Sequence, residues 1–184
     1  GVIQKKGSQT IHLAHGVIKT LSKQSDSQRL VQISRELKSI IAQHRPSQIA
    51  VEKLFFSKNI KTAVSVSQAR GVILMTCEQA QVKTVEYSPN EVKLAITGHG
   101  HADKSQIQKM VKALLGLKEI PRPDDAADAL AIALCHTQSQ LQLQQPQQQY
   151  YLNPQYPMFI PILANNMYIN STPGTGSNNN YYIS

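Results

Sequence analysis

Three carboxylate side chains are placed where they could hold divalent metal ions against a phosphodiester. Glu52 ends the apolar run Ile49-Ala50-Val51, and Asp125 and Asp128 lie in the run Asp-Ala-Ala-Asp-Ala-Leu-Ala. Residues three apart on a helix share a face, so Asp125 and Asp128 can point at one place. Because their neighbours are small or apolar, these acids need a positively charged partner, which a metal ion would supply. A metal-dependent nuclease is therefore the first hypothesis.

Each of these acids also has a structural explanation. Asp-x-x-Asp at a helix start is commonly an arrangement that caps the helix and complements its dipole. A single Glu in a strand can simply be held by a salt bridge. Two-metal cleavage of a phosphodiester needs several carboxylates around ions roughly 4 Å apart. From spacing alone, Glu52, Asp125 and Asp128 are an incomplete set for that chemistry.

The composition favours an anionic partner. The chain has 184 residues, enough for one domain with a hydrophobic core, and a formal net charge of +8 with a pI near 9.5. Every charged side chain lies between Lys5 and Asp128. The basic charge favours nucleic acid over a membrane as partner, although a merely soluble basic domain has the same composition. No apolar stretch has membrane-spanning length, and no signal peptide opens the chain.

The two cysteines bear on the compartment. Cys77 and Cys135 both lie among apolar neighbours in expected helices. We expect buried thiols in a reducing compartment, and hence a cytoplasmic protein, in preference to a disulfide.

Expected strands and helices alternate after an opening hairpin. Residues 1–6 and 10–18 are expected to pair as strands around a turn, and further strands are expected at 48–54 and 82–87. Expected helices begin near residues 25, 60, 89, 103 and 124, several of them behind capping residues. The order predicts an α/β domain with a mixed sheet flanked by helices.

The expected helix 60–80 has small or apolar residues on more than one side, with Gly71 in its middle. Such a helix suits a dimer interface, and it equally suits a central helix that its own domain covers.

The two ends of the sequence differ from the middle. Residues 139–184 are rich in Gln, Asn and Tyr and have no charged side chain, so we expect a disordered tail behind a folded domain of residues 1–138. The first residues already have the pattern of a strand in progress. We therefore expect that the sequence is truncated at its N-terminus.

Five segments, taken in order, resemble the RuvC-type Holliday junction resolvases. The resemblance covers residues 1–138 and excludes the tail. Its segments are Ile49–Phe56, Lys58-Asn59, Gln68–Gly71, Gln106–Val111 and Asp125–Ala131.

The resemblance implies an RNase H-like fold, a homodimer, and Mg²⁺-dependent symmetric nicking of four-way DNA junctions in recombination and repair. Glu52, Asp125 and Asp128 match three of the family's four catalytic, metal-binding carboxylates. Two Mg²⁺ ions are implied for each active site, with Mn²⁺ able to substitute. The resemblance alone implies the RuvA–RuvB branch-migration complex as a partner.

Three further positions match DNA-contacting residues of that family. Phe55 matches an aromatic side chain inserted near the crossover, and Lys93 and Lys104 match basic residues beside the active site. Phe55 could instead belong to the core, although two adjacent Phe residues after a strand cannot both point inward. The lysines could be solvated helix residues. A cation at a helix start, as at Lys104, is disfavoured by the dipole, which makes a phosphate contact the better explanation.

The loop residues His99 and His101 look like a metal pair, but the family needs no histidine there, so we interpret them as loop residues or at most phosphate contacts.

One part of the family pattern is missing. The family's first catalytic Asp stands on an opening strand in an Asp-Pro-Gly motif, and here no Asp precedes Asp26. Residues 1–184 are therefore expected to lack one metal ligand and one core strand, and to be inactive. A non-catalytic DNA-binding protein and a generic RNase H-like nuclease remain as alternatives.

Overall fold

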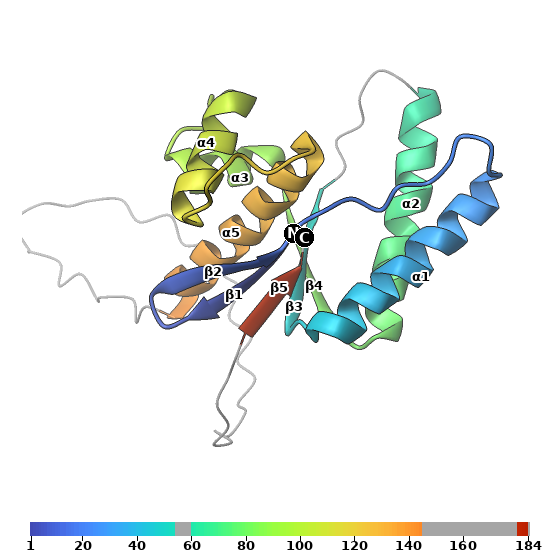
Figure 1. Ribbon diagram of the computed structural model, residues 1–184, viewed down its shortest axis with the longest axis horizontal. Coiled ribbons are helices and arrows are strands. Elements are labelled where there is room, and N and C mark those ends of the chain that lie inside the picture. Colours follow the sequence, from blue (N-terminus) through green and yellow to red (C-terminus); the bar gives the residue numbers. More distant parts are fainter. Residues whose placement is uncertain (54–59, 145–179, 184) are drawn as a thin grey trace, which may run out of the picture.

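A computed structural model describes residues 1–53, 60–144 and 180–183. In this part of the chain a mixed sheet is enclosed by two layers of helices (Figure 1). None of the described helices combines the length and apolar character that crossing a bilayer requires.

The sheet has the strand order β2-β1-β5-β3-β4. An antiparallel hairpin opens it, in which β1 (Val2–Lys6) turns through Gly7 (φ +59°) into β2 (Gln9–Ala14). The strands β3 (Gln48–Glu52) and β4 (Lys83–Tyr87) are parallel neighbours. The opening hairpin and a mixed sheet were expected from the sequence, and both are confirmed.

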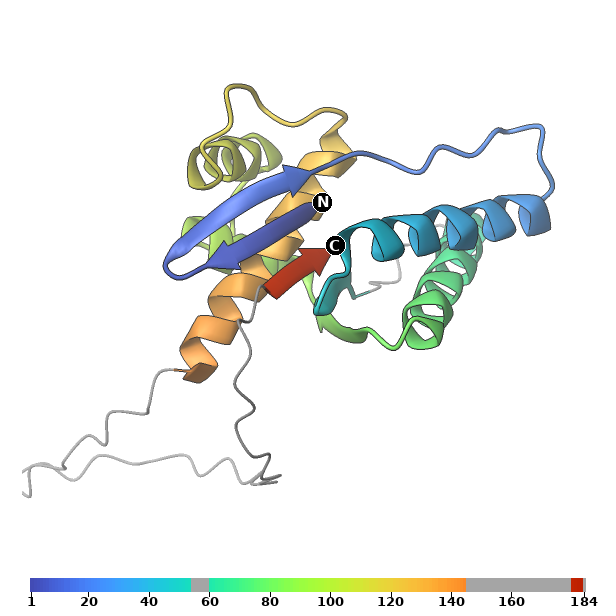
Figure 2. The same cartoon turned by 60° about the horizontal axis from the view of Figure 1, so that its bottom comes forward.

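The strand β5 (Asn180–Ile183) lies in the middle of the sheet. It runs antiparallel to β1, with Val2 opposite Ile183, and parallel to β3, with Gln48 opposite Tyr182. Within the described residues, the hairpin and the parallel pair join one sheet only through β5. Both views place the ends of the described chain side by side at this point (Figures 1 and 2).

Each helix layer covers one face of the sheet (Figures 1 and 2). The first layer contains α1 (Asp26–His44) and α2 (Ile60–Gln79). The second contains α3 (Pro89–Thr97), α4 (Lys104–Leu114) and α5 (Asp124–Gln144).

Apolar side chains that alternate between the two faces of the strands contribute to both hydrophobic clusters, one under each helix layer. On β1, Val2 packs into the cluster with α1 and α2, whereas its neighbour Ile3 packs into the cluster with α3, α4 and α5. On β3, Ile49 and Ala50 divide in the same way. Successive side chains of a strand point to opposite faces, so a sheet covered on both sides needs such unbroken apolar runs.

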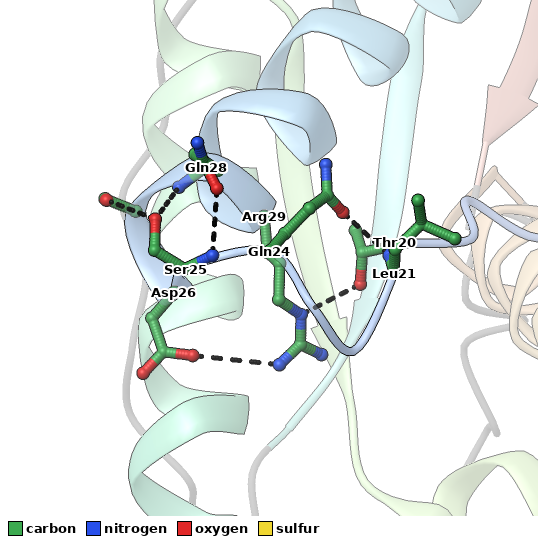
Figure 3. Close-up of polar contacts among 8 residues, drawn as sticks. Thr20, Leu21, Gln24, Ser25, Asp26, Gln28 and Arg29 are labelled. Carbon is green, nitrogen blue, oxygen red and sulfur yellow. Dashed lines mark hydrogen bonds and ion pairs between the residues drawn. The ribbon is translucent and has the colours of Figure 1, made fainter.

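The first turn of α1 shows why these residues begin a helix here (Figure 3). Ser25 is the N-cap: its hydroxyl accepts a hydrogen bond from the backbone N–H of Gln28 at 3.3 Å, and the Gln28 side chain accepts one from the Ser25 N–H at 2.9 Å. Arg29 ties the preceding loop to the helix, because its Nε donates to Thr20 Oγ1 at 2.9 Å. The capping residues expected from the sequence are therefore in use.

The structure adds two findings about the C-terminal part. The domain boundary was expected at residue 138, but α5 continues to Gln144 without a break. Residues 180–183 were expected to be disordered, and they form β5 in the sheet. One core strand was expected to be missing from the sheet. In the structure, β5 occupies the central position between β1 and β3. The rest of the expected tail, residues 145–179 and 184, lies outside the described residues.

Candidate active site

The carboxyl ends of β3 and β4 meet the N-terminal half of α5 at one edge of the sheet. Glu52 is the last residue of β3, and Asp128 lies in the second turn of α5. The carboxyl ends of parallel strands are where ligand sites form in open α/β sheets, because the chain leaves the sheet there and exposes its last side chains. The parallel pairing of β3 and β4 therefore places Glu52 at this edge.

A hollow of about 250 Å³ opens beside Glu52 and Asp128. Lys93 of α3 and Lys104 of α4 also line it. Apolar side chains supply much of the remaining wall, among them Val92, Ala102, Ile107, Ala131 and Ile132. Acids and bases thus share one open hollow, in which the Lys104 and Asp128 side chains stay 52% and 46% exposed.

Lys104 bridges two acids of α5. Its Nζ lies 3.3 Å from Asp128 Oδ2 and 3.5 Å from Asp124 Oδ2. The bond to Asp128 raises the pKa of Lys104, and Asp124 adds to the effect. α4 begins behind Asp103, whose side chain accepts a hydrogen bond from the backbone N–H of Gln106 at 2.8 Å. This cap fixes the start of α4 and holds Lys104 over α5.

Glu52 is under electrostatic strain. Partial removal of its carboxylate from water, followed by the negative charge of Asp128, raises the pKa of Glu52. A carboxylate whose pKa is raised by partial burial and by a neighbouring acid, as at Glu52, is stabilised in its charged form by a hard cation with oxygen ligands. Glu52 and Asp128 are oxygen donors of the kind that a divalent ion takes, but the described residues contain no group of three or more His, Cys, Asp or Glu side chains that could hold one.

Comparison with known proteins decides which family this site belongs to. A family model described as "Crossover junction endodeoxyribonuclease RuvC" matches residues 1–136. The chain belongs to the RuvC family. The resemblance drawn from the five sequence segments is thereby confirmed.

Curated RuvC relatives are similar over the same part of the chain. The crossover junction endodeoxyribonuclease RuvC of Caldicellulosiruptor saccharolyticus is 54% identical over 137 residues, which cover 74% of this chain and 82% of the relative. The enzyme of the same name from Halothermothrix orenii is 53% identical over 138 residues, covering 75% of this chain and 84% of the relative.

Solved RuvC structures share the fold. The structure of Thermus thermophilus RuvC aligns with a TM-score of 0.70 at 37% identity, covering 76% of this chain and 85% of that one. A second structure, of T. thermophilus RuvC in complex with Holliday junction substrate, aligns with a TM-score of 0.70 at 38% identity, covering 73% and 82%. The expected RNase H-like α/β fold of the RuvC family is confirmed.

The structure brings most of the predicted residues of this RuvC-type site together. Glu52, Asp128, Lys93 and Lys104 all line the hollow. Asp125 is exposed, and it is not among the residues that line the hollow in the described part of the chain. Phe55 lies outside the described residues.

Asp124 is the residue that sequence reasoning missed. It shares Lys104 with Asp128 four positions later and also pairs with Arg122 at 3.0 Å. The i, i+4 spacing of Asp124 and Asp128 was available in the sequence and could have found it. His99 and His101 lie in the exposed turn between α3 and α4, as expected of loop residues.

Proposed function

We propose that this chain is a structure-selective endodeoxyribonuclease that nicks four-way DNA junctions symmetrically during recombination and repair. The observation that carries the proposal is the hollow in which Glu52 and Asp128 meet Lys93 and Lys104. Membership of the RuvC family supports the reaction, and the similar T. thermophilus complex with Holliday junction substrate supports the kind of DNA.

Divalent ions, Mg²⁺ by preference with Mn²⁺ as a substitute, are proposed for this site. Glu52, Asp125 and Asp128 would hold them, since carboxylate oxygens are the ligands that such ions take in proteins. When bound, the ions would supply Lewis acidity for an attacking water and for the leaving oxygen. The crowding of Glu52 by Asp128 supports the assignment, because a nearby positive charge is what relieves it.

The basic residues of the hollow are proposed to hold the substrate. Lys93 and Lys104 face the acids from α3 and α4, so a phosphate brought to the acids would contact both ammonium groups. Lys104 would then exchange part of its pairing with Asp124 and Asp128 for the phosphate. Phe55 is proposed to stack on a base near the crossover, by the family resemblance alone.

Symmetric nicking needs two active sites, and a homodimer is proposed to supply them. Apolar side chains of α2 stay open to solvent in the single chain: Val64 is 52% exposed, Val66 50% and Met75 48%. A second copy covering this helix would remove that surface from water. The RuvA–RuvB complex as a further partner and a cytoplasmic location are proposals that rest on the family resemblance.

The catalytic power of residues 1–184 alone is a separate part of the proposal. The resemblance supplies one more aspartate, on a strand ahead of β1, that residues 1–184 do not contain. We expect this polypeptide to select junctions and to be inactive in cutting them. Fusing a strand with the Asp-Pro-Gly motif ahead of Gly1 should restore cleavage. That strand would compete with β5 for the sheet position beside β1.

The test compares a four-way junction with a linear duplex of equal length at fixed salt, because phosphate-driven affinity depends steeply on salt. Without divalent metal, residues 1–184 should prefer the junction. With Mg²⁺, the extended protein should nick it symmetrically, and Glu52→Gln should abolish cutting while binding persists.

Other outcomes would favour the alternatives. Junction binding without cutting in the extended protein points to a non-catalytic binder. Equal cutting of junction and linear duplex points to a generic RNase H-like nuclease. Equal affinity of the folded chain for both DNAs would overturn the proposal.

A further inference from the structure

Arg70 of α2 reaches the end of the strand that carries Glu52. Its Nε donates to the backbone carbonyl oxygen of Glu52 at 3.5 Å, and its Nη2 forms an ion pair with Glu86 Oε1 at 2.5 Å. The Arg70 side chain is 21% exposed and that of Glu86 39%, so this pair is better shielded than a typical surface pair. The ion pair with Glu86 holds the guanidinium group of Arg70 in place, and this group contacts the backbone carbonyl oxygen of Glu52.

These contacts lie where β3 ends. Glu52 is opposite Tyr87 in the parallel register, and the N–H of Lys53 donates to the Tyr87 carbonyl at 2.8 Å. On the α3 side, Lys53 Nζ lies 3.6 Å from Glu91 in an exposed pair. On the α2 side, the corresponding contact is the hydrogen bond from Arg70 to the Glu52 carbonyl oxygen. This contact therefore restrains the backbone of Glu52 from the layer opposite the hollow.

A carboxylate that holds a metal ion must be fixed to within about 0.5 Å, and groups that position such a ligand commonly contribute 10–100-fold to metal affinity. We propose that Arg70 is a positioning residue for Glu52, which links the orientation of this carboxylate to the position of helix α2. The proposal rests on the function proposed above, in which Glu52 binds divalent metal.

The test measures Mn²⁺ affinity calorimetrically on residues 1–184 without DNA, beside thermal unfolding and metal-free junction binding. Arg70→Ala removes both contacts and should weaken Mn²⁺ binding about 10–100-fold while junction affinity stays within twofold. Glu86→Gln weakens the fixation of the guanidinium and should have a smaller effect in the same direction. Arg29→Ala, an arginine of α1 that contacts Thr20 and Asp26, is the matched control.

The charge-swapped pair R70E/E86R separates positioning from simple stability. It can restore an ion pair between α2 and β4, and hence the melting temperature, but position 70 then has no donor for the Glu52 carbonyl. We expect the swap to recover unfolding stability and not Mn²⁺ affinity.

Mn²⁺ affinity recovered together with stability would overturn the positioning role, as would an unchanged affinity in Arg70→Ala. Should Arg70→Ala not fold, Glu86→Gln and the swapped pair decide alone. A wild-type chain that shows neither Mn²⁺ binding nor junction preference would instead overturn the proposed function, and this inference with it.

Discussion

The two helix layers of this molecule treat their apolar side chains differently. Against α3, α4 and α5 the largest apolar side chains are sealed: Ile3, Val111 and Leu130 are each 0% exposed. The buried cluster under α1 and α2 is smaller, and Val31 (67%) and Val64 (52%) stay exposed in that layer. The outer surface of α3 also exposes one leucine, Leu94 (58%), so the difference between the layers lies in the size of their buried clusters. The sealed layer carries the acids of α5 and the bases of the hollow, and the open layer is the one proposed above to face a second copy.

The largest expected effect comes from breaking the sealed layer. Leu130→Ala should lower the free energy of unfolding by about 2 to 5 kcal/mol, because the packed surroundings of a fully buried leucine cannot close over the cavity. Val31→Ala in the open layer should change it by less than about 0.5 kcal/mol. Urea unfolding of both variants measures the contrast, and equal losses would remove the distinction between the layers.

Burial in the layer of α3, α4 and α5 should also make the free energy of unfolding depend on pH. His136 is fully buried on α5, its Nδ1 lies 2.8 Å from Tyr87 Oη, and burial lowers its pKa to about 4. In the unfolded chain His136 binds a proton near pH 6.5, whereas in the folded chain it stays neutral down to about pH 4. The free energy of unfolding is therefore highest above pH 6.5 and falls as the pH drops toward 4. Between pH 7.5 and 5 the loss should be about 2 kcal/mol.

Urea unfolding of wild type and His136→Asn at several pH values tests this. Asn keeps a polar group near the Nδ1 position but does not titrate, so the variant should lose about 2 kcal/mol less over that interval. Parallel curves for the two proteins would contradict the assignment.

The open layer should be tested by its effect on assembly. The double variant Val64→Ser with Val66→Ser should weaken self-association at least about tenfold, since burying a valine is worth about 1.5 kcal/mol or more. Analytical ultracentrifugation measures this. Leu94→Ser, at a side chain 58% exposed on α3, is the control on the other face. If only the control weakens association, the dimer uses the other layer.

The smallest expected effect lies at the site itself. The raised pKa of Glu52 means that the folded chain holds this proton more tightly than the unfolded chain, so ionised Glu52 costs stability at neutral pH. In metal-free buffer, Glu52→Gln should slightly raise the urea midpoint near pH 8, and the gain should disappear near pH 4.

Glu91→Gln provides the opposite sign, because the hydrogen bond from Ser88 lowers the pKa of Glu91 and its charge stabilises the cap. This variant should lower the midpoint near pH 8. A lowered midpoint in both variants would show that Glu52 is not strained.

Local signals account for what the sequence predicted correctly. Ser25 with Gln28 and Asp103 with Gln106 are capping pairs within one turn, so both helix starts could be placed without knowledge of the fold. The apolar run before Glu52 likewise predicted the strand end where the carboxylate stands. Each of these depends on residues a few positions apart.

Non-local packing accounts for what the sequence did not reveal. Asp124 and Asp125 are adjacent, and which of them meets Lys104 depends on the rotation of α5, which buried residues such as Leu130 set against the sheet. The contact of Arg70 with Glu52 joins residues 18 positions apart through the packing of α2 on the sheet. The i, i+4 spacing of Asp124 and Asp128 offers Asp124 as a candidate, but no spacing in the sequence indicates that Lys104 pairs with it or that Arg70 reaches Glu52.

The place of β5 has a consequence for the order of folding. The hairpin β1–β2 and the α-connected pair β3–β4 can each form from nearby residues, but in the described chain they share no hydrogen-bonded ladder until residues 180–183 arrive between them. That closure joins segments far apart in the sequence and bears the largest loop entropy of the fold. In a refolding experiment on residues 1–184, the two halves should therefore form before the ladders of β5 that join them.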